Sequence, residues 1–496
     1  MARSPAPFSL AIDLTGHAGS LQRALYEALR EALTSGQLQP GARLPSSREL
    51  ARQLELARGT VVAVYAQLTS EGYLAGQLGA GTFVAAELPD RWFSVPASER
   101  NVTSREASTP RLSRWGSTLV DSPFGLDVRR AARPFRPHIP AVDAFPSELW
   151  QRLLARRARN DERLLLGDVD VRGYRPLREQ LAEHLRSARG VVCSAEQLVI
   201  LPSAQQALDL VGRLTLDVGA KVWLEEPGYP GARAVFGALG AKLVPVPVDE
   251  HGLDVAAAMA RAPDARLAYV TPGRQAPLGV TLSMERRLSL LAWASARGAL
   301  VVEDDYDSEY RYEGRPVPAL QGLDRTGVVV HVGTFSKTLL PSLRLAYALL
   351  PESLLERFLI AKSIVDRFTP PLSQAVLADF MAAGHFGRHL RRMRELYGER
   401  REALLSALSQ ELGEDCSIVG ASAGLDLTLR FARRRDDRKI CTALAEATIE
   451  ALPLSLQGVG RRSPTGLLLG FAAFSPARLK KSAAMLARVL TRERAG

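Results

Sequence analysis

A chain of 496 residues is too long for one domain and predicts two or three. Hydrophobic residues make up 46% and charged residues 24%, which is typical of a globular chain with a large core and excludes a disordered one. The formal net charge of +11 favours polyanionic partners. Cys193, Cys416 and Cys441 lie far apart, which indicates neither a disulfide framework nor a metal site. With no apolar run of membrane-spanning length, we expect a cytoplasmic protein that does not bind membranes.

The first segment predicts three short helices. The first carries leucines at every fourth position on one face: Leu21, Leu25, Leu29 and Leu33. The second should begin at Ser46, which forms an S-x-x-E capping box with Glu49, and should carry Leu50 and Leu54 inward. The third follows a tight turn at Glu55 and begins at about Ala57, with Val61, Val64, Tyr65 and Leu68 inward. Two short helices joined in this way are typical of a helix-turn-helix, whose second helix enters a major groove.

Two short strands with a glycine-rich tip follow, as in a wing. The segments PGARLPSSRELARQL and EGYLAGQLGAGTFV resemble the winged helix of GntR regulators, which sets residues 1–88 as a DNA-binding domain. The resemblance implies that Arg48, Arg58 and Thr60 lie against DNA and that Gly81 lets the wing approach a phosphate. The chain departs from the family at Glu55, Ala57 and Gly59, where Gly, Ser and Asn are usual, and the cap hydroxyl missing at residue 57 should cost about 1 kcal/mol.

Residues 89–132 lose periodicity and gain Pro, Ser, Thr and Arg, which predicts a flexible linker. Members of the resembled family have such linkers, and their length lets one DNA-binding unit reach over the partner subunit. We therefore expect a homodimer, with domain swapping as one arrangement.

Residues 133–496 alternate strand-like and helix-like runs, which predicts a doubly wound, mainly parallel α/β sheet with its site at the strand carboxyl ends. The strand-like runs cover 198–201, 222–224, 243–248, 267–270, 300–302 and 328–332. From about Tyr397 the chain looks like a smaller α+β domain.

Lys337 lies at the centre of the most informative stretch, residues 328–350. Two apolar runs flank a hydroxyl-rich loop that holds this lysine with Thr334, Ser336 and Arg344. An amine ringed by hydroxyls and a guanidinium suits a carbonyl cofactor with a phosphate, which condenses with the lysine to a Schiff base. A solvated surface lysine is the alternative for any single Lys.

A second cluster strengthens this interpretation. Residues 300–307 form an apolar strand with an acidic end, where Asp304 could face the pyridine nitrogen of pyridoxal phosphate (PLP). The segments EDDYDSEYRYEGRPVPALQGLD and GTFSKTLLPSLRLAY resemble fold type I aminotransferases, in particular the MocR subfamily of GntR-type transcription regulators. The resemblance implies a winged helix-turn-helix fused to an aminotransferase-like domain, residues 133–496, with a large doubly wound part and a small α+β part.

The same resemblance implies the PLP site. Lys337 carries the cofactor, and Tyr306 donates its phenol toward the ring oxygen. Ser203, Ala204 and Gln205 follow a strand and open a helix, whose free N–H groups can receive a phosphate. Tyr229 stacks on the pyridine ring; a plain wall tyrosine is the alternative.

Three segments depart from the resembled subfamily. Residues 271–279 replace TPSHQFPTG, with Gly273, Arg274, Ala276 and Leu278 substituted in the loop that lines the effector pocket. Residues 168–174 replace YGDPRGY, which puts in doubt the tyrosine that reaches the neighbouring subunit's phosphate. Residues 467–471 lack the arginine that transaminases keep for the substrate carboxylate; Arg461 and Arg462 are near but unassigned.

Three hypotheses follow. The first is a transcription regulator that binds DNA and senses PLP, an amine or an amino acid through Lys337, with at most partial transamination. The second is an aminotransferase with an accessory DNA-binding segment. The third is a dimerisation module whose altered loops have abolished PLP binding. The winged helix and the missing carboxylate arginine favour the first; effector, operator and direction of regulation do not follow from the sequence.

Overall fold

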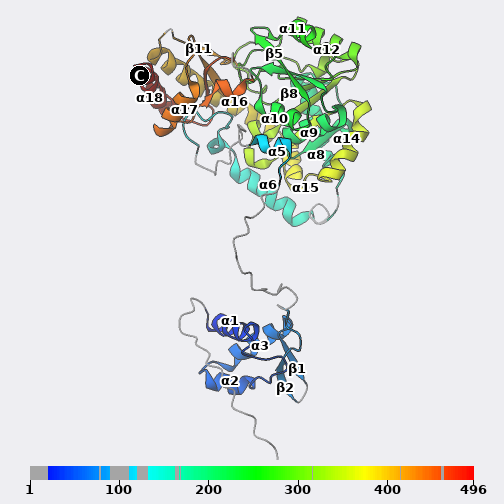
Figure 1. Ribbon diagram of the computed structural model, residues 1–496, viewed down its shortest axis with the longest axis vertical. Coiled ribbons are helices and arrows are strands. Elements are labelled where there is room, and N and C mark those ends of the chain that lie inside the picture. The colour runs from blue at the N-terminus through cyan, green and yellow to red at the C-terminus, as the bar shows by residue number, and fades with distance from the viewer. Residues whose placement is uncertain are drawn as a thin grey trace, which may run out of the picture. The chain divides into compact units, whose positions relative to one another are not determined.

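The computed structural model describes residues 20–77, 80–89, 111–119, 132–161, 167, 169–314, 317–413, 415–459 and 463–495. The chain divides into two compact units, residues 1–111 and 112–496, each with its own hydrophobic core (Figure 1). The expected linker, 89–132, contains a short helix, α5 (Arg114–Thr118), which the sequence analysis did not predict. Most of the remaining linker, 90–110 and 120–131, lies outside the described residues.

The first unit has the order predicted for a winged helix-turn-helix: α1 (Leu21–Thr34), α2 (Ser47–Gln53), α3 (Arg58–Ser70), and the antiparallel strands β1 (Leu74–Gln77) and β2 (Gly81–Val84). The apolar residues predicted to face inward on these helices are buried, apart from two. Leu54 is only partly buried, and Leu21 is exposed because it begins α1 beyond the edge of the core.

The helix starts differ in their caps. Ser46 Oγ accepts from the Glu49 N–H at 3.2 Å, as the capping box requires. In a capping box the Glu49 carboxylate would also accept from the Ser46 N–H. It accepts instead from Arg52 at 2.6 Å and from Gln53 at 3.4 Å. Ala57 begins α3 without a side-chain cap, as its residue type predicts. Glu55 holds a left-handed turn with φ 53°, a conformation that a non-glycine residue adopts at a cost.

The second unit is built on the predicted doubly wound sheet, with strand order β3-β10-β9-β8-β7-β4-β5-β6. The pairs from β9 through β8, β7 and β4 to β5 are parallel, while β10 and β6 run antiparallel to their neighbours. The strands are β3 (Leu198–Leu201), β4 (Lys221–Glu226), β5 (Lys242–Asp249), β6 (Gly252–Leu253), β7 (Leu267–Val270), β8 (Leu300–Asp305), β9 (Val329–Thr334) and β10 (Ala346–Leu349).

Helices cover both faces of this sheet (Figure 1). One core cluster packs α9 (Ala204–Thr215), α10 (Pro230–Ala238) and α14 (Glu352–Val365) on it, and another packs α11 (Val255–Arg261) and α12 (Met284–Arg297). The remaining helices of this part are α6 (Ser147–Asn160), α8 (Arg175–Arg189), α13 (Phe335–Thr338) and α15 (Pro371–Ala382).

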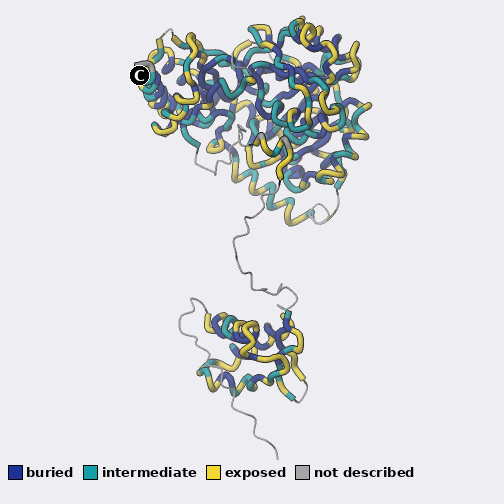
Figure 2. The backbone as a smooth tube through the Cα atoms, in the orientation of Figure 1, coloured by how far each residue is buried: buried dark blue, intermediate teal, exposed yellow. Residues whose placement is uncertain are grey.

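The smaller part of the second unit is the predicted α+β lobe. The expected start of this lobe, Tyr397, falls in the middle of the uninterrupted helix α16 (His385–Glu411). This helix packs against α18 (Pro476–Ala495). The lobe's antiparallel sheet has the order β11-β12-β14-β13, and its elements are β11 (Cys416–Val419), β12 (Asp426–Phe431), α17 (Asp437–Glu446), β13 (Leu452–Pro453), β14 (Gly466–Gly470) and α18 (Pro476–Ala495). Buried residues run through the central sheet and continue into this lobe (Figure 2).

Candidate PLP site and nucleic-acid interface

The acidic end of β8 gives each carboxylate its own buried partner. Glu303 accepts from His331 at 3.0 Å, and Asp305 forms an ion pair with Arg189 at 2.8 Å. Asp304 lies between them. An acidic strand end often serves as a metal or solvated site, but within the described part of the chain no cluster of His, Cys, Asp and Glu has metal-binding geometry. Glu303 and Asp305 therefore face cationic or N–H-bearing groups of the protein.

Asp304, like Asp305 and Asp307, has one buried carboxylate oxygen left to receive such a group. Its Oδ2 accepts from Tyr269 Oη at 2.7 Å, while Oδ1 is buried and has no hydrogen-bond partner among the described residues. Burial raises the pKa of Asp304 to about 6, and the Tyr269 hydrogen bond opposes this shift. An unpaired buried acceptor is costly unless a donor binds it. A protonated pyridine nitrogen would be such a donor.

Lys337 lies in α13, a single helical turn after β9, where the sequence analysis expected a loop. Its Nζ donates to the carbonyl oxygen of His138 at 2.9 Å. Burial lowers the pKa of Lys337, whereas the charges of Asp426, Asp307 and Asp304 raise it. A lysine with a lowered pKa reacts more readily as an amine, so the site suits a lysine that condenses with an aldehyde.

The predicted phosphate-binding residues lie at two turns. Ser203 caps α9, accepting from the Gln206 N–H at 3.2 Å, so the predicted strand-to-helix turn is present at Ala204 and Gln205. Thr334 caps α13 and accepts from the Ser336 N–H at 3.1 Å. Helix N-termini present free N–H groups to an anion, and both turns follow strands of the same sheet.

Arg344 is exposed and adopts a left-handed conformation with φ 51°, two residues before Ala346, which pairs with Thr334 in the sheet. This register places Arg344 near the α13 turn, as expected of a guanidinium that receives a phosphate. The backbone of Arg344 therefore lies near that of Thr334, and the role of its guanidinium stays a prediction.

The two predicted aromatic residues have different partners. Tyr229 precedes α10, accepts a hydrogen bond from Gln205 at 3.3 Å and stacks near Tyr269, at 6.4 Å between ring centroids. Tyr306 Oη accepts from Arg274 Nη1 at 2.9 Å. The Tyr306 hydroxyl hydrogen therefore stays available for the cofactor oxygen that the sequence analysis assigned to it.

Sequence reasoning missed two residues of this site. His138 contacts Lys337 through its carbonyl, and its ring Nδ1 pairs with Asp426 Oδ2 at 2.7 Å. Asp426 begins β12 of the small lobe and also pairs with Arg274 at 3.0 Å. Their only sequence signal was the odd Arg274 in the altered segment 271–279. The partners come from distant parts of the chain, which no local pattern reveals.

The predicted DNA-contacting residues lie on the helix-turn-helix. Arg48 in α2 and Arg58 at the first position of α3 are exposed, and Thr60 is half-buried in the first turn of α3. Exposed arginines at the start of the second helix can hold phosphate or read guanine edges. The structure brings these residues to one helix pair, as the sequence predicts.

Gly81 opens the second wing strand with φ 117°, a backbone conformation that favours glycine. A Cβ atom there would lie 3.2 Å from Nε of Arg43, an exposed side chain that sequence reasoning did not single out. Arg43 reaches the wing because its backbone forms a β-bridge with Phe83. It adds a third arginine to the candidate DNA-binding residues.

Comparison with known proteins decides the family. Residues 21–84 match the model of bacterial regulatory proteins of the gntR family, and residues 144–485 match that of class I and II aminotransferases. Over 461 residues the chain is 40% identical to the probable rhizopine catabolism regulatory protein MocR of Rhizobium meliloti, covering 93% of this chain and 92% of that protein. The chain belongs to the MocR subfamily of GntR-type transcription regulators.

Other relatives of this MocR-type chain extend the comparison. It is 32% identical to the HTH-type pyridoxine biosynthesis transcriptional regulator PdxR of Corynebacterium glutamicum, covering 92% of both chains. Among solved structures, it resembles LysN, the α-aminoadipate aminotransferase of Thermus thermophilus complexed with N-(5'-phosphopyridoxyl)-L-leucine, with TM-score 0.68 and 29% identity over 73% of this chain and 92% of that one.

The MocR-type chain keeps a site that fits PLP. Asp304 offers an unpaired buried acceptor to a pyridine N–H, Lys337 offers an amine, the α9 turn offers N–H groups to a phosphate, and the α13 turn offers the hydroxyls of Thr334 and Ser336. Bound there, PLP would supply an aldehyde and an electron sink. Asp168, Arg461 and Arg462 lie outside the described residues.

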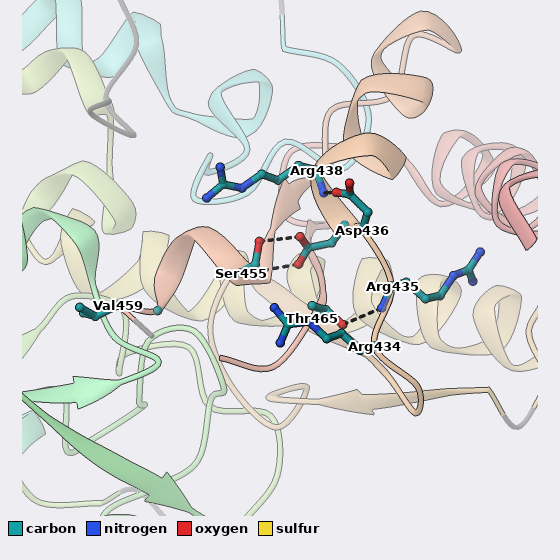
Figure 3. Close-up of a pocket in the computed structure, with 9 residues that line it drawn as sticks. Arg434, Arg435, Asp436, Arg438, Ser455, Val459 and Thr465 are labelled. Carbon is teal, nitrogen blue, oxygen red and sulfur yellow. Dashed lines mark hydrogen bonds between the residues drawn. The ribbon is translucent and has the colours of Figure 1, made fainter. Parts of the chain in front are cut away.

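A pocket of about 560 Å³ in the MocR-type chain lies elsewhere, in the small lobe at the start of α17 (Figure 3). Asp436 caps that helix, and Asp437 accepts from Ser455 Oγ at 2.5 Å, so these acids serve the fold. Arg435 and Arg438 extend in different directions rather than toward a shared centre. The pocket therefore lacks a converging set of polar groups. Within the described residues, no helix is long and apolar enough to cross a membrane.

Proposed function

We propose that this DNA-binding regulator carries PLP covalently on Lys337 and responds to PLP itself or to an amine or amino acid that reacts with it. The main support is that one site contains both the Lys337 amine and the buried Oδ1 of Asp304, which has no partner among the described residues. The other unit of the same chain is a winged helix-turn-helix. Similarity to a regulator of pyridoxine biosynthesis adds to it.

In this proposal each residue of the site has a binding or orienting role. Asp304 holds the pyridine nitrogen protonated, Tyr229 lies on the ring face, and Tyr306 donates to the ring oxygen. Ser203, Ala204, Gln205, Thr334, Ser336 and Arg344 form the phosphate-binding set. The carbonyl of His138 positions the Lys337 amine before the cofactor binds.

The signal would pass through a change in lobe contacts. When an effector amine takes the place of Lys337, the freed lysine regains the His138 carbonyl as its acceptor. His138 pairs with Asp426 of the small lobe, so the change reaches β12 directly. In a cytoplasmic homodimer with long linkers, such a shift would alter how the two DNA-binding units are spaced.

The second candidate is an aminotransferase with a DNA-binding accessory. The match to class I and II aminotransferases over residues 144–485 favours it, and both candidates use Lys337. Multiple-turnover transamination at about 10 per second, the usual enzyme median, would promote this alternative.

The deciding experiment uses full-length protein and DNA sites selected from a random library. Footprints with and without PLP are compared, and the PLP-loaded protein is reduced with borohydride and analysed by peptide mass. The proposal expects PLP on the peptide that contains Lys337 and a footprint that changes with PLP or with an added amine. Protein that takes up no PLP, or a footprint indifferent to both, overturns it.

A further inference from the structure

Arg274 lies among the acid groups around Lys337 with both of its Nη groups engaged. Its Nη1 donates to Tyr306 Oη at 2.9 Å and to Asp307 Oδ2 at 3.1 Å. Its Nη2 donates to the carbonyl of Asp426 at 2.7 Å and to that residue's Oδ1 at 3.0 Å. A guanidinium has a fixed fork of donors, and this one faces protein acceptors at both ends. An incoming carboxylate therefore finds both Nη groups occupied, and the Nε, which has no partner among the described residues, is buried against Gly424.

The partner of Arg274 is itself locked. The Arg274 and Asp426 side chains are each 1% exposed, and Asp426 Oδ2 pairs with His138 Nδ1 at 2.7 Å. Although burial opposes it, the charges of His138 and Arg274 hold the pKa of Asp426 well below its usual range. A ligand that displaced Asp426 would leave a buried charge without its partner, which is strongly unfavourable.

Arg274 packs directly against the backbone of Gly424. Gly424, with φ 83°, lies directly against the pair, and a Cβ atom there would be 2.4 Å from both Arg274 Nε and Asp307 Oδ2. Arg274 is thus held between Gly424 and its acid partners. The arginine acts as a fixed part of the pocket wall.

Acid groups also outnumber bases around Lys337. Asp304, Asp307 and Asp426 all act on it electrostatically, with Arg274 as the neighbouring fixed cation. Asp307 Oδ1 is buried and has no hydrogen-bond partner within the described part of the chain. Burial raises the pKa of Asp307 to about 7, against the effect of Arg274, and a cationic ligand would favour its ionised form. The pocket is suited to a donor and repels an added carboxylate.

We infer that the effector is a primary amine without a carboxylate, whose second polar group, an ammonium or a hydroxyl, donates to Asp307. In this inference Arg274 is a specificity residue that Asp426 withholds from carboxylate ligands. The inference rests on the proposed function, since it assumes that the amine reacts with PLP held on Lys337.

The test compares matched ligands on full-length, PLP-loaded protein by isothermal titration calorimetry. Ethanolamine is paired with serine and 1,4-diaminobutane with ornithine, which differ by one carboxylate. We expect the amine of each pair to bind at least about tenfold more tightly, the effect of one charged hydrogen bond. Equal binding, or tighter binding of the amino acids, overturns the inference. Borohydride trapping on the same sample reports separately on PLP at Lys337, so failure of the proposed function is seen independently.

Variants locate the cause. Asp426→Asn removes the charge that engages Arg274, so a ligand carboxylate can pair with this arginine. We expect the ratio of amine affinity to amino-acid affinity to fall by about tenfold. Asp307→Asn should weaken amine binding by a similar factor even if the first variant fails to fold. The control, Asp249→Asn, breaks an ion pair with Arg286 at 2.6 Å outside the pocket and should leave both ratios unchanged. The inference is overturned if the ratio of amine affinity to amino-acid affinity is unchanged in both Asp426→Asn and Asp307→Asn.

Discussion

The two units of the chain place their functional side chains in opposite environments. Arg48 and Arg58 are exposed on short helices, and their positions depend on local turns and caps. Arg274 and Asp426 are almost fully buried, and they meet across two lobes of the second unit. The first unit can therefore change its ligand contacts without changing its core, whereas the second cannot.

This contrast has a functional consequence. An exposed arginine can be replaced with little effect on folding, so loss of DNA binding would report directly on contact. A buried carboxylate supports the fold and the ligand together, so its replacement must be read with a second measurement. The predictions below run from the largest expected effect to the smallest and test whether the two units behave in these different ways.

Replacing Lys337 with Ala should abolish the covalent adduct altogether, because Lys337 supplies the amine that acts electrostatically on Asp304. Borohydride reduction and peptide mass analysis check this, with DNA affinity measured in parallel and expected to remain near wild type without ligand. A matched control is Lys362→Met, which removes another lysine that is buried in the structure and pairs with Asp366 at 2.7 Å. A borohydride-trapped adduct in the Lys337 variant, or loss of the adduct in the Lys362 variant, would assign the cofactor to another residue.

Arg58→Ala should lower affinity for selected DNA by about 10- to 100-fold, since a guanidinium that reads a base is worth about 1–3 kcal/mol. Fluorescence anisotropy with full-length protein measures it, and PLP uptake should not change. Arg52→Ala is the control, because that exposed arginine pairs with Glu49 at 2.6 Å on the same helix pair. Equal losses in the two variants would remove Arg58 from the base-reading set.

Arg43→Ala should act differently from Arg58→Ala. Its guanidinium lies against Gly81 at the wing, so we expect a phosphate contact that weakens binding to all sequences alike and lowers the salt slope by about 1. Affinities at several salt concentrations, on selected and on random DNA, check this. A loss confined to the selected sequence would assign Arg43 to base recognition instead.

The sequence predicted the strands of the sheet and the helices of the winged unit, because apolar periodicity and caps are local. It placed the start of β8 at Leu300, the start of β9 within one residue, and Ser46 at its cap, while both strands extend two or three residues beyond the predicted ends. It also marked Lys337 and Asp304, since each follows a buried strand whose carboxyl end faces the same edge of the sheet.

What the sequence could not predict depends on contacts between distant segments. The segment 271–279 was recognised as altered, but nothing local shows that Arg274 meets Asp426 or that Gly424 leaves space for it. His138 lies far from any motif and adopts φ 65°, which brings its carbonyl to Lys337. The expected return bond of Glu49 failed for a similar reason, because its carboxylate had nearer donors in Arg52 and Gln53.

The smallest effect concerns the start of α3, where Ala57 provides no side-chain cap. Ala57→Ser should stabilise this helix by about 1 kcal/mol and slow hydrogen exchange of its first turns by about fivefold, measured by mass spectrometry on the full chain. Ser46→Ala, which removes the existing cap of α2, should speed exchange there by a similar factor. If only the Ser46 variant responds, α3 is held by the packing of Val61 and Val64 rather than by its first turn, because both side chains are fully buried.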